Sequence, residues 1–110
     1  MSDGLIDHAV FDELRETAGA DFAAELVATF LEEAPGMIAD LKAAVEGGDA
    51  DAYRRAAHSM KSNADVFGAS PLAELSRNLE LAGLGNAADA ATLEAEFERT
   101  SVALRGLIDG

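Results

Sequence analysis

The sequence predicts an all-α protein, an antiparallel four-helix bundle with a short N-terminal capping helix. Apolar residues recur at helical spacing through most of the 110 residues, and no segment alternates between apolar and polar residues as a strand does. Short glycine-containing links separate the periodic segments, which is typical of an antiparallel bundle. A chain of this length builds one core, so we expect a single domain over residues 1–110.

The first two expected helices cover residues 5–18 and 20–47. Asp7 is suited to cap the start of the first helix and Gly19 to end it, and this short helix is interpreted as a cap over the end of the bundle. Pro35 interrupts the hydrogen bonds of the long helix, but the apolar residues before and after it stay in phase. That phase favours one kinked helix over a break with Pro35 starting a second helix. The expected apolar stripe comprises Phe22, Leu26, Phe30, Met37, Leu41, Ala44 and Val45.

The remaining three helices are expected over residues 50–67, 71–84 and 87–108. Each follows residues that commonly start a helix, and each of the first two is followed by glycine. The starting residues are Asp49 for the first, Ser70-Pro71 for the second, and Asn86 with Asp89 in the capping-box position for the third.

The composition and charge of the chain argue against several classes of function. With 21 acidic and 8 basic residues the net charge is −13, which disfavours binding to nucleic acid or to an anionic membrane surface. Cysteine is absent and the two histidines lack metal-ligand spacing, so no metal site is expected. The start is acidic rather than a signal peptide, and no apolar run is long enough to span a membrane. We expect a cytoplasmic monomer.

His58 is predicted to lie on the outer face of the 50–67 helix. At about 100° per residue, the apolar residues of this helix cluster on the side opposite to His58. That expected core stripe comprises Tyr53, Ala56, Met60, Ala64 and Phe67. The residues within about 60° of His58 are Arg54, Arg55, Lys61, Ser62 and Asp65. A histidine kept for packing would belong to the first group.

An exposed histidine among three cations on an acidic protein favours a site that handles anions. Neutral imidazole has one free ring nitrogen, which is a competent nucleophile toward phosphorus. Lys61 lies one turn further along and could offset the charge of phosphoryl oxygens, while the small Ser62 leaves room for a partner. The residues alone thus indicate an exposed nucleophile or an anion site, and the alternative is a solvated surface histidine.

The segment AHSMKSNADVFGASPLAELSRNLE, residues 57–80, resembles the signature of histidine-containing phosphotransfer (HPt) domains. That signature runs Ala-His-x-Leu-Lys-Gly-Ser, then Gly-Ala, then Leu-x-x-Leu-x-x-x-Leu-Glu on the following helix. The matching positions are Ala57, His58, Lys61, Gly68, Ala69, Leu72, Leu75, Leu79 and Glu80. With similar residues upstream, namely Phe30, Glu33-Ala34-Pro35 and Gly48-Asp49, the resemblance covers about residues 20–82.

The resemblance implies a single HPt-like domain that is a phosphorelay intermediate in two-component signalling. His58 would accept a phosphoryl group at Nε2 from an aspartyl phosphate on one receiver domain and pass it to an aspartate on another, with Lys61 stabilising the group. The expected partners are response-regulator receiver domains, with a hybrid sensor kinase as a further candidate. The expected docking residues are Arg54, Arg55, Ser62, Asp65 and Arg77.

The same resemblance implies a phosphotransfer protein with a phosphohistidine intermediate rather than a turnover enzyme. No autokinase activity and no cofactor are expected, and the Mg²⁺ ion is expected on the receiver partner. Ser62 and Asn63 depart from the family pattern of Gly followed by Ser, and we predict a hydrogen-bond partner for Asn63 on a neighbouring helix. The main alternative is a helical adaptor that is not phosphorylated. A sensor-kinase dimerisation helix is disfavoured because Ser59, not an acidic residue, follows the histidine.

Overall fold

The computed structural model describes residues 4–109, and all regular structure in that range is helical. The all-α class predicted from the sequence is confirmed. The helices are α1 (His8–Ala18), α2 (Ala20–Gly47), α3 (Ala50–Val66), α4 (Ser70–Ala82) and α5 (Ala87–Asp109). None of these helices combines the length and the apolar character needed to cross a membrane.

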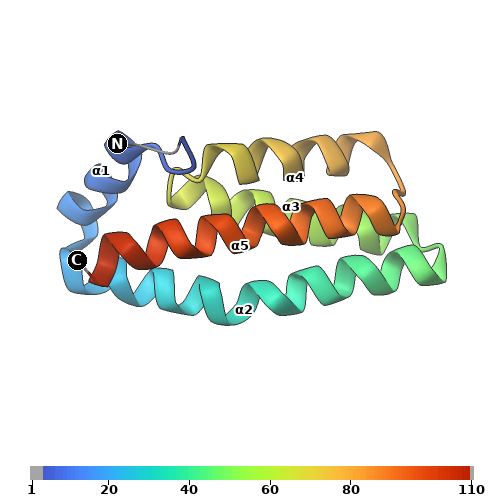
Figure 1. The fold of residues 1–110 in the computed structure, drawn as a ribbon, viewed down its shortest axis with the longest axis horizontal. Coiled ribbons are helices and arrows are strands. Elements are labelled where there is room, and N and C mark those ends of the chain that lie inside the picture. The colour runs from blue at the N-terminus through green and yellow to red at the C-terminus, as the bar shows by residue number, and fades with distance from the viewer. Residues whose placement is uncertain (1–3, 110) are drawn as a thin grey trace.

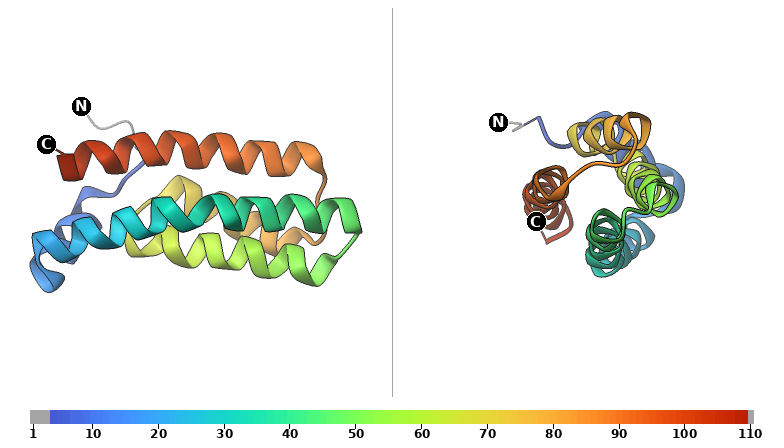
Figure 2. Two further views of the ribbon diagram at one scale, coloured as in Figure 1. Left: turned by 90° about the horizontal axis from the view of Figure 1, so that it is seen from below. Right: turned by 90° about the vertical axis from the view of Figure 1, so that its right-hand side faces the viewer.

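Helices α2 to α5 lie side by side along the long axis of a molecule that measures 42 × 25 × 19 Å, and α1 lies at one end (Figure 1). The end-on view in Figure 2 shows these four helices arranged around a common centre. Helix α3 lies between α2 and α4 and packs more extensively against both than any other pair of helices does. The outer face of α3 is therefore bordered by α2 on one side and by α4 on the other.

The helix starts mostly follow the predicted caps. Asp7 Oδ1 accepts a hydrogen bond from the amide of Ala9 at 3.0 Å, and Asp49 Oδ1 accepts one from Ala52 at 3.0 Å. At the start of α5 the predicted capping box is present in both directions. The Asn86 amide donates to Asp89 Oδ2 at 2.9 Å, and the Asp89 amide donates to Asn86 Oδ1 at 3.0 Å.

The bounds of α1 and α4 differ most from expectation, while α3 and α5 each end within one residue of the expected end. Helix α1 begins at His8 instead of residue 5, because Asp7 is extended (φ −78°, ψ 102°) and acts as the cap itself. Helix α4 begins at Ser70 and ends at Ala82, instead of running from 71 to 84. The Ser70 hydroxyl does not cap this helix but donates back to the Gly68 carbonyl, and Gly83 ends the helix with φ 87°.

Helix α2 is continuous through Pro35, so the alternative of two separate helices is not what forms. The residues on both sides of Pro35, Ala34 and Ile38, are buried in the same core, which holds the helix together despite the missing hydrogen bond. Phe22 was wrongly assigned to the buried stripe, since it is 52% exposed. At about 100° per residue it points about 80° away from Phe30, and the smaller Ala23 takes the inward position.

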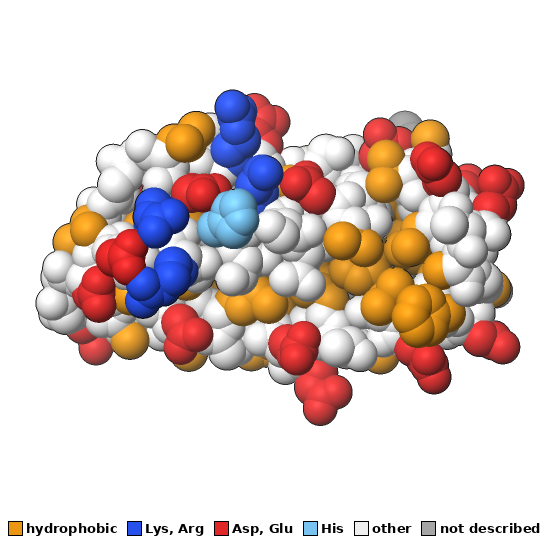
Figure 3. All heavy atoms as spheres, turned by 180° about the vertical axis from the view of Figure 1, so that it is seen from behind, with side chains coloured by type: hydrophobic (Ala, Val, Ile, Leu, Met, Phe, Trp, Pro, Cys, Tyr) orange, Lys and Arg blue, Asp and Glu red, His pale blue; other side chains and the backbone are white. Residues whose placement is uncertain are grey.

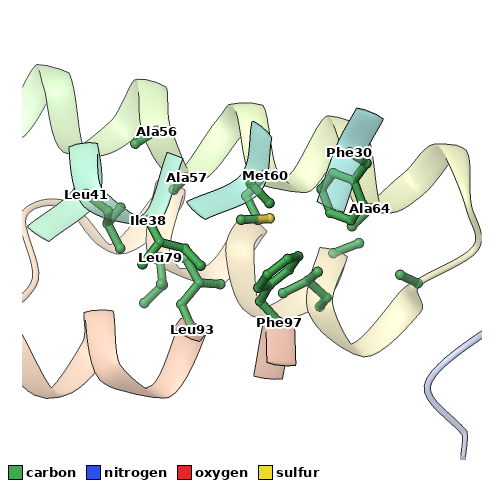
Figure 4. Close-up of a cluster of buried hydrophobic side chains, with 14 of the residues drawn as sticks. Phe30, Ile38, Leu41, Ala56, Ala57, Met60, Ala64, Leu79, Leu93 and Phe97 are labelled. Carbon is green, nitrogen blue, oxygen red and sulfur yellow. The ribbon is translucent and has the colours of Figure 1, made fainter. Parts of the chain in front are cut away.

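The core fixes the orientation of α3 about its own axis. Phe30 stacks on Phe67 with ring centroids 5.4 Å apart and meets Phe97 edge-on at 5.7 Å. Figure 4 shows the surrounding apolar side chains converging from α2, α3, α4 and α5. Met60 and Ala64 of α3 are fully buried in this cluster, so the opposite side of α3 must face outward.

Besides the burial of Phe11 in the core, two hydrogen bonds attach helix α1 and its cap to the bundle. The Asp7 amide donates to the carbonyl of Gly68, in the turn between α3 and α4, at 2.7 Å. Arg15 Nη2 donates to the carbonyl of Leu107, near the end of α5, at 2.7 Å. Gly68 has φ +71°, and a Cβ atom there would lie 2.8 Å from both Asp7 O and Val10 Cβ. This close approach explains why glycine occupies the position.

Candidate functional site

His58 projects from the outer face of α3, and its side chain is 56% exposed. The predicted core stripe of this segment is confirmed, because all five of its members are buried. These are Tyr53, Ala56, Met60, Ala64 and Phe67. The exposed imidazole therefore stands on a helix face whose direction is set by packing on the other side, and it is available to a partner.

The imidazole is held by Glu80, which lies on α4. His58 Nδ1 is 2.9 Å from Glu80 Oε2, and the Glu80 side chain is only 18% exposed. An ionised carboxylate only accepts hydrogen bonds, so Nδ1 carries the proton of the neutral ring and the lone pair is on Nε2. The contact therefore selects the tautomer whose second ring nitrogen is nucleophilic.

The packing of α4 explains where Glu80 points. Leu72, Ser76 and Leu79 are buried, and the Ser76 hydroxyl donates to the Leu72 carbonyl at 2.8 Å instead of remaining unpaired in the core. Glu80 follows Leu79 by one residue, about 100° around the helix, which brings its carboxylate to the edge of α4 next to α3. In the sequence Glu80 was only one of the motif matches, and its contact with His58 was not predicted.

The two arginines that precede His58 share one carboxylate on their own helix. Arg54 Nη2 lies 2.8 Å from Asp51 Oδ1, and Arg55 Nη1 pairs with Asp51 Oδ2. The hydrogen bond from Arg54 and the charge of Arg55 hold the pKa of Asp51 below its usual value. The hydrogen bond to Asp51 raises the pKa of Arg54, and Glu80 adds to this through its charge. The charges of Asp51 and Glu80 thus both favour the protonated form of Arg54.

The two cations beyond His58 are held less tightly. Lys61 Nζ is 3.7 Å from Asp65 Oδ2, a long contact for an ion pair. Arg77 of α4 forms no ion pair with any residue that the structure describes, and it lines a shallow groove of about 250 Å³ together with Lys61 and Asp65. Of the four cations around His58, only Arg54 and Arg55 are thus held by a close carboxylate among the described residues.

Comparisons with known proteins agree with this geometry. The family model of the Hpt domain matches residues 25–109. The chain belongs to the Hpt domain family. It is also similar to the crystal structure of histidine-containing phosphotransfer protein B (HptB) from Pseudomonas aeruginosa PAO1, with 27% sequence identity and a TM-score of 0.87. That match covers 98% of this chain and 97% of the other. No curated protein matches the sequence.

Membership in the Hpt family gives this domain a phosphotransfer role in a phosphorelay, and proteins of the family interact with receiver domains. Within residues 4–109 there is no group of three or more His, Asp or Glu side chains arranged to hold a metal ion.

The two departures from the family pattern are neighbours on α3, with Ser62 about 40° and Asn63 about 140° around the helix from His58. Ser62 is exposed beside His58. Asn63 has a hydrogen-bond partner as predicted, but the partner lies on its own helix and not on a neighbouring one. Its Nδ2 atom donates to the Ser59 carbonyl of the same helix at 2.8 Å, because a side chain at the helix edge reaches the carbonyl four residues back more easily than another helix.

The face of the Hpt domain that carries a histidine among lysines and arginines also exposes apolar side chains (Figure 3). These gather toward the end of the molecule where α1 lies, and two of the exposed large apolar residues, Phe22 and Val66, belong to the helix ends at that end. Leu81, next to Glu80, is also exposed.

An open groove of about 650 Å³ runs between α2 and α3 beside the histidine face. Its walls are mostly small side chains, Ala43, Ala44, Gly47, Ala52 and Ala56. Arg55 and Ser59 line the side nearest to His58. An open, shallow groove of this kind suits contact with a protein surface better than enclosure of a small molecule.

Proposed function

We propose that this Hpt domain accepts a phosphoryl group on His58 Nε2 from the aspartyl phosphate of one receiver domain and transfers it to an aspartate of another. In this proposal it acts as an antiparallel four-helix bundle, with α1 as a cap, that presents His58 from the outer face of α3. The observation that carries the proposal is the 2.9 Å contact between His58 Nδ1 and Glu80, on a half-exposed ring. A solvated surface histidine without a function would be hydrogen-bonded by water and would not require a largely buried carboxylate as its partner.

The chemistry follows from that contact. The Nε2 lone pair attacks the phosphorus atom, the P–O bond to the receiver aspartate breaks, and its electron pair leaves with the carboxylate. Because Nδ1 keeps its proton, the phosphorylated ring is positively charged, and Glu80 lies where it stabilises that charge. In the second transfer an aspartate oxygen attacks phosphorus, the N–P bond breaks, and its electron pair returns to Nε2.

Lys61 is the residue best placed to balance the charge of the phosphoryl oxygens. It lies one turn beyond His58 on the same face, and its contact with Asp65 is long enough to be given up at little cost. Because a phosphoryl transition state spreads negative charge over three oxygens, an ammonium group one turn from His58 helps transfer in both directions.

The receiver is proposed to dock on the face around His58, and four features support this. The exposed apolar residues supply area for contact, and the groove between α2 and α3 supplies shape. Arg54, Arg55 and Arg77 supply positive charge, and Ser62 leaves space beside the ring. Asp65 takes part by setting the position of Lys61.

We propose that Mg²⁺ belongs to the receiver and that the chain itself uses no cofactor. We also propose that the chain acts as a cytoplasmic monomer.

The test is transfer of labelled phosphate from a phosphorylated receiver domain. We expect acid-labile, base-stable label on the wild-type protein and on His8→Gln, which changes the other histidine of the chain, but not on His58→Gln. Circular dichroism checks that both variants keep their helices. Label on His58→Gln would overturn the assignment, and the lack of label on the wild type with a panel of receivers would favour the unphosphorylated adaptor.

A further inference from the structure

Asp51 faces the same side of α3 as His58. The two residues are seven positions apart, so Asp51 lies about two turns toward the start of the helix and within about 20° of His58 around it. Arg54 and Arg55 lie between them along the helix. Since both guanidinium groups contact the Asp51 carboxylate, both point toward the start of α3 and away from His58.

The shared carboxylate keeps both arginines occupied in the free protein. All three side chains are more than half exposed, so each ion pair is screened by water and is weak. A carboxylate offered by a docking protein can therefore replace Asp51 as the partner of either arginine. The docking carboxylate gains only the difference in free energy between its own contact with the arginine and the contact of that arginine with Asp51, because the contact with Asp51 must first be broken.

We propose that Asp51 is a specificity-determining residue. It pairs with Arg54 and Arg55, so these arginines favour only receivers whose carboxylates are placed to displace Asp51. This inference rests on the proposed function, because it presumes that receivers dock around His58. A receiver with diffuse negative charge gains little from arginines that are already paired. A receiver with carboxylates facing the start of α3 recovers two charge-assisted contacts and retains the apolar contact area as well.

The role of Asp51 differs from that of an ordinary surface charge. Asp40 provides the matched control, because it is an exposed aspartate that lines the same groove as Arg55 and forms no ion pair with any described residue. Asp51→Asn and Asp40→Asn change the net charge by the same amount, and only the first releases the two arginines. Any difference between them therefore reports on the arginines and not on overall charge.

The experiment measures association with a receiver that labels the wild-type protein, and with a variant of that receiver whose docking-face carboxylates are replaced by amides. We expect Asp51→Asn to speed association with the acidic receiver by about two- to five-fold at low salt, the range that exposed ion pairs allow, and to steepen its salt dependence. We expect no gain with the amide variant of the receiver. Asp40→Asn should give a smaller, salt-dependent change.

A second variant separates this effect from any loss of helix stability. Adding Arg54→Gln and Arg55→Gln to Asp51→Asn should abolish the gain, whereas a merely structural effect of Asp51→Asn would persist. Equal rates for Asp51→Asn and Asp40→Asn, or no gain at all, would overturn the inference while normal labelling of His58 leaves the proposed function intact. Failure to label the wild-type protein would overturn both.

Discussion

Replacing Glu80 with Gln tests whether the carboxylate stabilises the charged ring or only orients it. Gln keeps the length of the side chain and an oxygen that accepts the hydrogen bond from His58 Nδ1, but it removes the negative charge. A hydrogen bond to a charged group contributes about 1.5–3 kcal/mol and a neutral one about 0.5–1.5 kcal/mol, and we take the lower ends because the imidazole is half exposed. The difference is about 1 kcal/mol, so at about 1.4 kcal/mol per factor of ten phosphoryl transfer to His58 should slow about five-fold.

The assay is rapid-quench transfer from a phosphorylated receiver under single-turnover conditions at saturating receiver, which separates the chemical step from docking. Glu80→Ala should be slower still, because it removes the orienting contact as well. Glu74→Gln is the matched control, since Glu74 lies on the same helix, is exposed, and forms no ion pair with a described residue. A Glu80→Gln variant that transfers at the wild-type rate would refute the reasoning that the charge of Glu80 matters.

Two further predictions concern the scaffold. Gly68→Ala should lower the free energy of unfolding in urea by about 1–3 kcal/mol, because its Cβ would overlap Asp7 O and Val10 Cβ in a left-handed backbone position. Gly36→Ala, which meets no atom within 4 Å inside α2, should instead be neutral or stabilising, and equal effects of the two changes would contradict this account. Burial raises the pKa of Tyr53 above 10.0, and this residue is the single tyrosine of a chain without tryptophan, so ultraviolet absorbance should show ionisation with a midpoint above 10. Because the folded pKa is the higher one, this group's contribution to stability should be complete below pH 10 and decline above it, and a midpoint at or below 10 would exclude a buried phenol.

The features that depend on a single helix could be predicted from the sequence. The outward direction of His58 follows from periodicity within α3, and the capping box of Asn86 and Asp89 involves residues three positions apart. Such features need no knowledge of how helices are placed against one another. For the same reason the all-α class and the continuity of α2 through Pro35 were accessible from the pattern of apolar residues.

The features that were missed depend on contacts between helices or on a choice among several partners. The contact of Glu80 with His58 needs the axial position of α4 relative to α3, which periodicity does not supply. Asp51 pairs with both Arg54 and Arg55, a choice of partner that helical spacing alone does not decide. The Asn63 amide donates to a carbonyl of its own helix, a local partner that competes with any partner on another helix.

The double attachment of α1 links parts of the chain that are far apart in sequence. Arg15 and Leu107 are 92 positions apart, and their hydrogen bond forms only when both ends of the described chain are in place. Closing such a long loop costs entropy, so α1 is expected to dock late in folding, after α2 to α5 have packed. Once docked, it ties the last turns of α5 to the turn between α3 and α4 through Asp7 and Gly68. Local opening at that end then requires three segments to separate together, which makes fraying cooperative.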